Sequence, residues 1–216
     1  MSLKKLDRLQ EEVLESFFRR ERRFFLTGGG ALVGFYLGHR ETKDLDLFAT
    51  EDVLSDGLSA LEQVARELGA QLESIRTAPD FRQLLLKRGN DAVVIDLVRD
   101  RAPQIVAEKR ELGGIRVDPP EEILINKLCA LLSRAEVRDL VDVRALENAG
   151  YPVEEALPLA ARKEGGLTPG QLAWVLSQIS IGDDATPPGR VSAAELRKYL
   201  VDLIARLSRL ALPPSP

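Results

Sequence analysis

The stretch GGGALVGFYLGHRETKDLDLF, residues 28–48, carries two aspartates, Asp44 and Asp46, separated by one residue. Side chains alternate between the two faces of a β-strand, so both carboxylates share one face and Leu45 and Leu47 share the other. Carboxylates about 6–7 Å apart along a strand repel each other unless a cation lies between them. Oxygen ligands with no Cys or His cluster favour magnesium or manganese over zinc. The segment therefore predicts a strand that holds a divalent cation.

A third carboxylate, Asp96, lies in the apolar run VVIDLV, residues 93–98. A lone charge there is costly to bury unless it is paired or binds a metal. Taken alone, Asp96 fits a salt-bridged strand residue equally well. Together with Asp44 and Asp46 it completes a set that can hold two cations bridging a nucleotide's phosphates and an attacking hydroxyl. Phosphoryl-type transfer requires mainly positioning and charge neutralisation, which these residues can supply.

The triple glycine, Gly28 to Gly30, follows the strand-like FFLT at residues 24–27. Such a run lets the backbone approach closely, and its N–H groups can cradle phosphate oxygens at the start of a helix. A glycine run alone often marks only a tight turn, whereas glycines followed by Asp-x-Asp on the next strand are more specific. The sequence has no GxxxxGK[ST] motif and no kinase HRD or DFG set, so it supports neither a P-loop enzyme nor a protein kinase.

The hydrophobic pattern predicts an α/β (α+β) domain over residues 1–117 and a helical domain over 118–216. In the first domain we expect helices at 3–20, 31–37 and 58–68, strands at 24–26, 43–48, 71–77, 81–88 and 92–98, and an edge strand at 116–117. Gly69 is the expected cap of the third helix, and residues 88–91 are the expected hairpin turn. In the second domain we expect helices at 121–132, 137–148, 153–162, 168–179 and 192–210.

The helical part carries a second charged cluster, INKLCALLSRAEVRDLVDV, residues 125–143. On one continuous helix, a single face would present Lys127, Arg134, Arg138 and Asp142. However, residues 133–136 resemble a capping box, and a new helix beginning there would put Asp139 and Asp142 one turn apart. Two interpretations of these charges remain open. They form ion pairs on the surface, or they are partly buried and face the phosphates of a nucleotide. The apolar residues between the charges favour partial burial.

Composition narrows the class of protein. The chain has 216 residues, 44% hydrophobic and 30% charged, as in soluble globular proteins. A net charge of −4 excludes a globally basic nucleic-acid footprint but leaves a local basic groove open. We interpret the arginine run at residues 19–23 as a solvated helix face rather than such a groove. The single cysteine, Cys129, allows no intramolecular disulfide, and the single His39 cannot build a histidine-rich metal site. With no long apolar run and an acidic amphipathic N-terminal helix, we expect a cytoplasmic protein that does not bind membranes.

Residues 28–48 resemble the AbiEii/AbiGii-type toxin nucleotidyltransferases, a branch of the DNA polymerase β-like nucleotidyltransferase superfamily. The residues that match the family pattern are Gly28, Gly29, Ala31, Leu32, His39, Arg40, Asp44, Leu45, Asp46, Leu47 and Phe48. Gly30 and Thr42 stand where Thr and Ser are common in the family. The Asp96 segment looks like the family's third-carboxylate strand. The downstream element of the family is matched by Lys127, Arg134, Arg138, Asp139 and Asp142.

This resemblance implies a nucleotidyltransferase fold, a short mixed sheet flanked by helices and followed by a helical domain. It also implies transfer of a nucleoside monophosphate from an NTP to an acceptor hydroxyl. The expected ligands of two Mg²⁺ (or Mn²⁺) ions are Asp44, Asp46 and Asp96, and the expected catalytic set adds Lys127 and Asp142. The expected nucleotide-binding residues are Gly28, Gly29, Gly30, Arg40, Thr42, Lys127, Arg134 and Arg138.

The resemblance further implies a toxin–antitoxin or phage-defence role, with RNA such as tRNA as the acceptor and a cognate antitoxin as a partner. Two alternatives remain open from the sequence. One is a nucleotidyltransferase that acts on a small molecule of the aminoglycoside type. The other is a non-catalytic module that binds a nucleotide or a partner protein. The retained carboxylates disfavour the second alternative, because a dead enzyme need not keep those charges.

Overall fold

The computed structural model describes residues 6–212, and its internal contacts divide the chain into two compact units, Met1–Pro119 and Pro120–Pro216. The start of the predicted helix at residues 3–5 lies outside the described residues. The first unit is built on a mixed sheet, and the second consists of helices. This confirms the predicted mixed α/β fold class.

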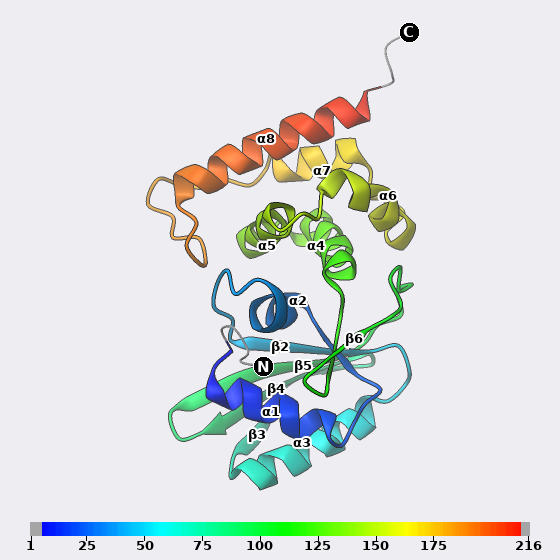
Figure 1. The fold of residues 1–216 in the computed structure, drawn as a ribbon, viewed down its shortest axis with the longest axis vertical. Helices are drawn as coiled ribbons and strands as arrows, with labels where there is room; N and C mark the ends of the chain where they lie inside the picture. The colour runs from blue at the N-terminus through cyan, green and yellow to red at the C-terminus, as the bar shows by residue number, and fades with distance from the viewer. Residues whose placement is uncertain (1–5, 213–216) are drawn as a thin grey trace. The chain divides into compact units, whose positions relative to one another are not determined.

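Seven strands form the sheet of the first unit, in the order β3-β4-β5-β2-β1-β7-β6 (Figure 1). Their bounds are β1 Phe25–Thr27, β2 Asp44–Ala49, β3 Gln71–Ala78, β4 Phe81–Arg88, β5 Asp91–Arg99, β6 Arg110–Leu112 and β7 Ile115–Val117. The pairs β2·β5 and β1·β7 are parallel, and the other pairs are antiparallel. The β4·β5 hairpin turns at the predicted residues, where Gly89 has a φ of 60°.

One face of this sheet is covered by α1 (Arg8–Phe18) and α3 (Leu54–Leu68), while α2 (Gly28–Ala31) lies over the other face (Figure 1). Leu45, Leu47 and Leu97 point into the α1/α3 side and are fully buried. A Cβ placed on Gly57 of α3 would lie 2.6 Å from the ring of Phe24, so helix and sheet are in close contact there. The alternation along β2 thus turns its carboxylates to the opposite face.

The chain around the glycine run differs from the prediction. The helix begins at Gly28 rather than at residue 31, and from Leu32 to Tyr36 it is wound as a π-helix. Gly28 makes the early start possible, because its φ of 61° reverses the chain directly after the extended Thr27. α3 likewise begins at Leu54, before the predicted residue 58, and ends at the predicted Gly69 cap with a φ of 62°.

The predicted edge strand at 116–117 is wrong in its position. The strand β7 lies inside the sheet, between β1 and β6, with Leu26 opposite Val117. The edge is β6, which the sequence did not indicate because its three residues are too few to show an alternating pattern. Gly113 and Gly114 both have positive φ and form the turn between β6 and β7.

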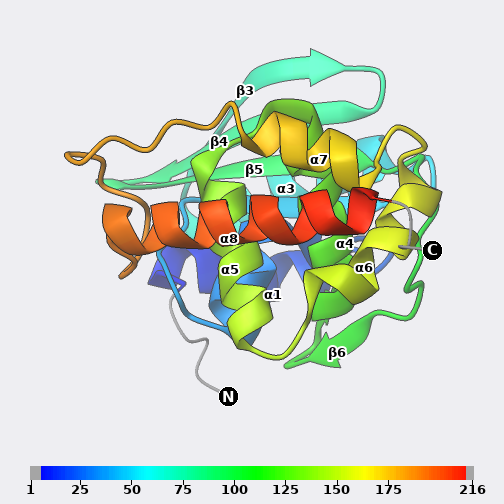
Figure 2. The same ribbon diagram turned by 90° about the horizontal axis from the view of Figure 1, so that it is seen from above.

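The second unit contains α4 Pro120–Arg134, α5 Val137–Asn148, α6 Val153–Lys163, α7 Pro169–Leu176 and α8 Ala193–Ala211. α7 packs along α8 (Figure 2). The predicted caps at Thr168 and Ser192 are confirmed, since both side chains accept a backbone N–H three residues ahead. No helix in residues 6–212 is both long enough and apolar enough to cross a membrane.

The predicted capping box at residues 133–136 is wrong, although the helix does break there. The Ser133 hydroxyl donates instead to the carbonyl of Ala130, and Glu136 caps α5 without a side-chain bond. Ala135, with a φ of 49°, produces the break. The charged residues of this segment therefore belong to two helices, not to one continuous face.

Candidate active site

The register of the two central parallel strands places Asp46 of β2 directly opposite Asp96 of β5. Partners in neighbouring strands lie about 4.8 Å apart and point to the same face. Asp44 is on that face too, two residues earlier on β2. All three aspartates are partly exposed. The structure thus brings the three predicted carboxylates onto one face of the sheet, opposite the face packed by α1 and α3.

The glycine run lies directly against this acidic strand. A Cβ placed on Gly28 would lie 2.3 Å from Oδ2 of Asp46, closer than any real side chain can approach. A Cβ on Gly30 would lie 3.4 Å from the backbone oxygen of Asp44. The glycine run and the acidic strand are therefore in contact, most closely at Gly28, where a Cβ would collide with the carboxylate as it stands.

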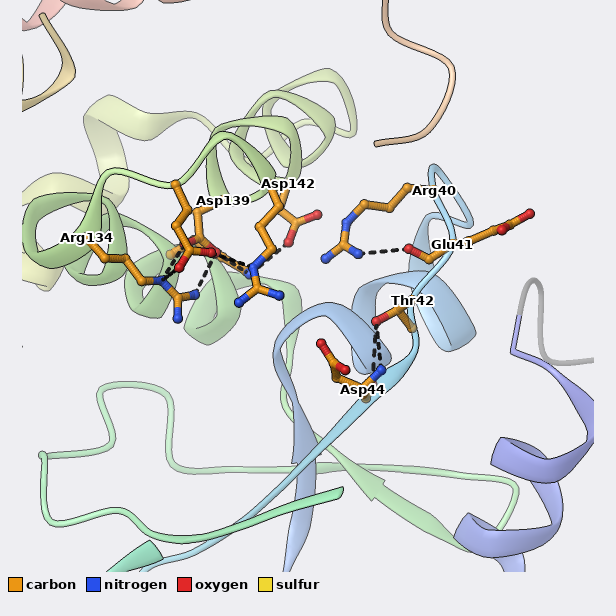
Figure 3. A network of polar contacts seen from close by, with 10 residues as sticks. Arg40, Glu41, Thr42, Asp44, Arg134, Asp139 and Asp142 are labelled. Carbon is orange, nitrogen blue, oxygen red and sulfur yellow. Dashed lines mark hydrogen bonds and ion pairs between the residues drawn. The ribbon is translucent and has the colours of Figure 1, made fainter. Parts of the chain in front are cut away.

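Arg40 and Thr42, both predicted to contact the nucleotide, meet the middle glycine. A Cβ on Gly29 would lie 2.5 Å from Nη2 of Arg40 and 3.5 Å from the hydroxyl of Thr42. Arg40 is buried, and its Nη1 donates to the backbone oxygen of Glu41 at 2.9 Å. The Thr42 hydroxyl lies 3.5 Å from both the nitrogen and the oxygen of the Asp44 backbone (Figure 3). This loop therefore lies beside both the glycine run and the acidic strand.

Sequence reasoning missed three polar residues that support this site, two on the sheet and one that anchors the neighbouring loop. Gln83 of β4, opposite Asp96 in the register, donates from Nε2 to Oδ1 of Asp96 at 3.0 Å. Gln10 of α1 donates to the backbone oxygen of Thr42 at 2.9 Å and anchors its loop. Thr27 is buried opposite Asp46, and its Oγ1 has no hydrogen-bond partner within residues 6–212. These positions become visible only when the strand register and the helix packing are known.

The donor set fits a hard divalent cation in its chemistry, with three carboxylates on one face and no thiol or imidazole among the three residues. The backbone register brings the carboxylates together, and the rotamers of their side chains decide whether they converge. As the side chains stand, no group of three or more His, Cys, Asp or Glu residues in the described part of the chain is arranged to hold a metal ion. Gln83 holds one oxygen of Asp96, which fixes the direction of that carboxylate.

The second predicted cluster lies within the helical unit, with Lys127, Asp139 and Asp142 buried and both arginines exposed. Nζ of Lys127 lies 2.7 Å from Oδ1 of Asp139 and 2.8 Å from Oδ2 of Asp142. Arg134 reaches the same Asp139 with Nε at 2.8 Å and Nη2 at 3.1 Å (Figure 3). Both aspartates are fully buried, and Lys127 is 7% exposed. Arg138 is exposed and pairs with Glu136 at 2.7 Å.

Electrostatics keeps this cluster ionised. Burial opposes the charged form of Lys127, but the charges of Asp142 and Asp139 outweigh it and raise the pKa of Lys127 above its usual value. Burial likewise opposes the charged form of Asp139, but hydrogen bonds from Arg134 and the charge of Lys127 lower the pKa of Asp139. Two cations and two anions therefore balance, with Lys127 and both aspartates buried and Arg134 covering Asp139 from the exposed side.

The arginine run at residues 19–23 forms surface ion pairs. Each of the four arginines contacts at least one carboxylate, and the partners are Glu21, Asp56, Glu67 and Glu111. The basic charge of this run is thus neutralised locally. The arginines are solvated as predicted, but they do not form a helix face, because α1 ends at Phe18 and the run follows it.

Solved structures with low sequence identity share this fold. JHP933 from Helicobacter pylori is 20% identical, with a TM-score of 0.57, over 94% of this chain and 92% of its own. MenT4, a nucleotidyltransferase toxin from Mycobacterium tuberculosis, is 18% identical, with a TM-score of 0.52, over 94% of this chain and 85% of its own. At these identities the likeness establishes the fold alone.

A comparison with curated proteins finds no match to this sequence. A family model for the nucleotidyltransferase AbiEii toxin of type IV toxin–antitoxin systems matches residues 13–207, which is most of the chain. That range includes the glycine run, the three carboxylates of the sheet and the buried cluster of the helical unit. The chain therefore belongs to the AbiEii nucleotidyltransferase toxin family.

Proposed function

We propose that this protein transfers a nucleoside monophosphate from an NTP to a hydroxyl of RNA such as tRNA. The observation that carries the proposal is the register of β2 and β5, which sets Asp46 opposite Asp96, with the glycine run packed against Asp46. In the reaction the acceptor oxygen forms a bond to the α-phosphorus, and the bond between that phosphorus and the bridging oxygen breaks. Pyrophosphate leaves, and the proton of the acceptor hydroxyl passes to a base.

The carboxylates and the glycine run have different proposed roles in this reaction. Asp44, Asp46 and Asp96 would hold Mg²⁺ or Mn²⁺, whose charge offsets that of the triphosphate. Asp96 is also our candidate for drawing the proton from the acceptor hydroxyl, because its carboxylate is partly exposed and the hydrogen bond from Gln83 orients it. The N–H groups of the glycine run would bind phosphate oxygens, with the Arg40 guanidinium beside them.

The buried cluster of the helical unit orients Lys127. A lysine ammonium has three N–H donors, and Asp139 and Asp142 take two of them. The third can donate to a phosphate oxygen, so we propose that Lys127 binds the nucleotide and that both aspartates position it. Arg134 would keep Asp139 in place, and Arg138 would assist at the surface.

Family membership supports a cognate antitoxin as a partner, as the family's description implies. A cytoplasmic location follows from the proposed substrates, because NTPs and tRNA are found there. A role in phage defence is part of the same proposal.

Labelled nucleotide tests the proposal directly. The purified protein would be incubated with each α-labelled NTP, Mg²⁺ and total tRNA, and with aminoglycosides in a parallel series. We expect label in tRNA, and a loss of about 100-fold or more in Asp46→Asn and Asp96→Asn, as when a group that stabilises transition-state charge is removed. Asp52→Asn is the matched control, since this surface aspartate pairs with Arg99 away from the site.

Two results would count against the proposal. Full activity in either folded variant, with circular dichroism like that of the wild type, would overturn the role of the carboxylates. Label in an aminoglycoside but not in tRNA would overturn the choice of acceptor.

A further inference from the structure

A row of apolar side chains crosses the carboxylate face of the sheet beside Asp46 and Asp96. The register aligns Phe81 of β4 with Val98 of β5, Val98 with Phe48 of β2, and Phe48 with Phe25 of β1. On every strand this row lies two residues from the polar row that contains the aspartates. The two rows are therefore parallel and about 6–7 Å apart. We call the four residues Phe81, Val98, Phe48 and Phe25 the apolar row.

The apolar row is closed at one end and open along the rest. Phe25 is fully buried, with the Phe48 ring 6.4 Å away and Nζ of Lys109 4.1 Å from its centre. Phe48, Val98 and Phe81 are only partly buried, whereas their neighbours on the opposite face, such as Leu97, are completely buried. Partly exposed apolar side chains that lie side by side on three strands mark a candidate binding surface.

An exposed cation lies over the open end of the row. Arg76 of β3 is opposite Gln83 in the register, and its Cζ lies 5.9 Å from the centre of the Phe81 ring. Within residues 6–212, no carboxylate forms an ion pair with Arg76. A guanidinium that already contacts an aromatic ring loses less freedom when it binds a phosphate than a freely rotating one. The open end of the row thus combines a π-surface with an anion-binding group.

The aspartates lie between the glycine run and the apolar row. Along β2, the glycine contacts involve Thr42, Asp44 and Asp46, while Phe48 lies beyond Asp46 in the other direction. If the glycine run holds the triphosphate, the second substrate must approach the carboxylates from the other side. That side is the apolar row.

We infer that Phe48, Val98 and Phe81, with Arg76, form the acceptor subsite and bind an unpaired nucleobase at the end of an RNA strand. This inference rests on the proposed function. The base lies against the apolar row, a neighbouring phosphate pairs with Arg76, and the ribose spans the distance to Asp96. Stacking of a base on an aromatic side chain contributes about 1–3 kcal/mol. An aminoglycoside offers no planar ring, and its positive charge is repelled by Arg76.

Two conservative variants test the subsite. Phe81→Leu removes the π-surface but keeps an apolar side chain, and Arg76→Gln removes the charge. The first measurement is steady-state transfer to an RNA oligonucleotide with an unpaired 3′ end. We expect the KM for RNA to rise about tenfold in each variant, in line with the stacking contribution, while the KM for NTP is unchanged. The control is Arg66→Gln, an exposed arginine on α3 at the opposite face of the sheet.

A binding measurement separates this inference from the proposed function. Fluorescence anisotropy of labelled RNA, without NTP, reports the subsite whether or not transfer occurs. We expect weaker binding in both variants, and in Arg76→Gln a salt dependence of log K that is shallower by about one phosphate contact. If transfer fails but binding still depends on Phe81 and Arg76, the proposed reaction is wrong and the subsite stands.

Three results would overturn the subsite. They are unchanged RNA binding in both folded variants, absence of RNA binding by the wild-type protein, and an equal rise in the KM for NTP. The last result would assign the ring to the nucleotide rather than to the acceptor.

Discussion

Replacement of Lys127 by methionine should strongly destabilise the helical unit. Methionine has a similar length and keeps the apolar stem, so packing is largely preserved and the charge is lost. The change removes contacts of 2.7 and 2.8 Å to two carboxylates that are completely buried. Breaking a buried ion pair by deleting one partner costs about 3–5 kcal/mol, because the remaining charge has no water to solvate it.

The expected effect can be measured as a free energy of unfolding. Urea titration followed by circular dichroism should show a loss of about 3–5 kcal/mol, and thermal melting should fall by about 12 °C or more for a unit of this size. Arg138→Met is the matched control. Its ion pair with Glu136 is on the surface, so the change should stay within about 1 kcal/mol.

A second substitution identifies the cause of the loss. Asp142→Asn in the Lys127→Met background leaves Arg134 and Asp139 as a balanced pair, and it should recover about 1–3 kcal/mol. If the double variant is no more stable than Lys127→Met, the cost comes from packing rather than from unpaired charge. A loss under about 1 kcal/mol for Lys127→Met itself would refute the buried-cluster argument altogether.

The pH dependence of this cluster follows from the direction of each pKa shift. The pKa of Lys127 is raised above its usual 10.5, so its contribution to stability is complete below that pH and is lost as pH rises through the folded value. The pKa of Asp139 is lowered below its usual 3.8, so its contribution is complete above that pH and is lost as pH falls. The gap between wild type and Lys127→Met should therefore be constant near neutrality and narrow in acid.

Two further changes test the sheet face and the packing of the helical unit. Gly28→Ala should abolish transfer, because its Cβ would collide with the Asp46 carboxylate. The control is Gly69→Ala, which has the same left-handed backbone but open space around it. This control should lose about 1–2 kcal/mol of stability and keep its activity. Activity in folded Gly28→Ala would contradict the site. Glu147→Gln should lower the free energy of unfolding by about 1–3 kcal/mol. The reason is that the Glu147 carboxylate accepts one hydrogen bond from Tyr199 and two from Arg206. An unchanged urea midpoint would contradict this prediction.

Much of this fold could be predicted because local patterns and tertiary packing agree. Burial alternates along the middle of β4 and β5, and Gly69 and Thr168 end or begin helices by local chemistry. The failures lie where the cause is not local. Strand β6 exists because β7 pairs with it, and the helix begins at Gly28 because its positive φ reverses the chain there, close to the Asp46 carboxylate.

The candidate site likewise contains features that local sequence determines and features that depend on tertiary packing. Asp44 and Asp46 could be placed on one face from the period of a single strand. The position of Asp96 opposite Asp46, and of Gln83 beside it, depends on strand order, which sequence spacing does not determine. The same register produces the apolar row, whose members are scattered from Phe25 to Val98 in the sequence. A side-by-side set of residues from four strands can be recognised only from the paired sheet.

The two groups of aspartates differ in their surroundings, and this difference indicates which of them act on substrate. Asp139 and Asp142 are completely buried and matched by Lys127 and Arg134, so their charge is used inside the protein. Asp44, Asp46 and Asp96 are partly exposed on one face of the sheet, where Gln83 donates to Asp96. A cation or a substrate can reach a partly exposed carboxylate, whereas a completely buried one is closed to both. The exposure of these three side chains therefore favours a role in binding metal and nucleotide.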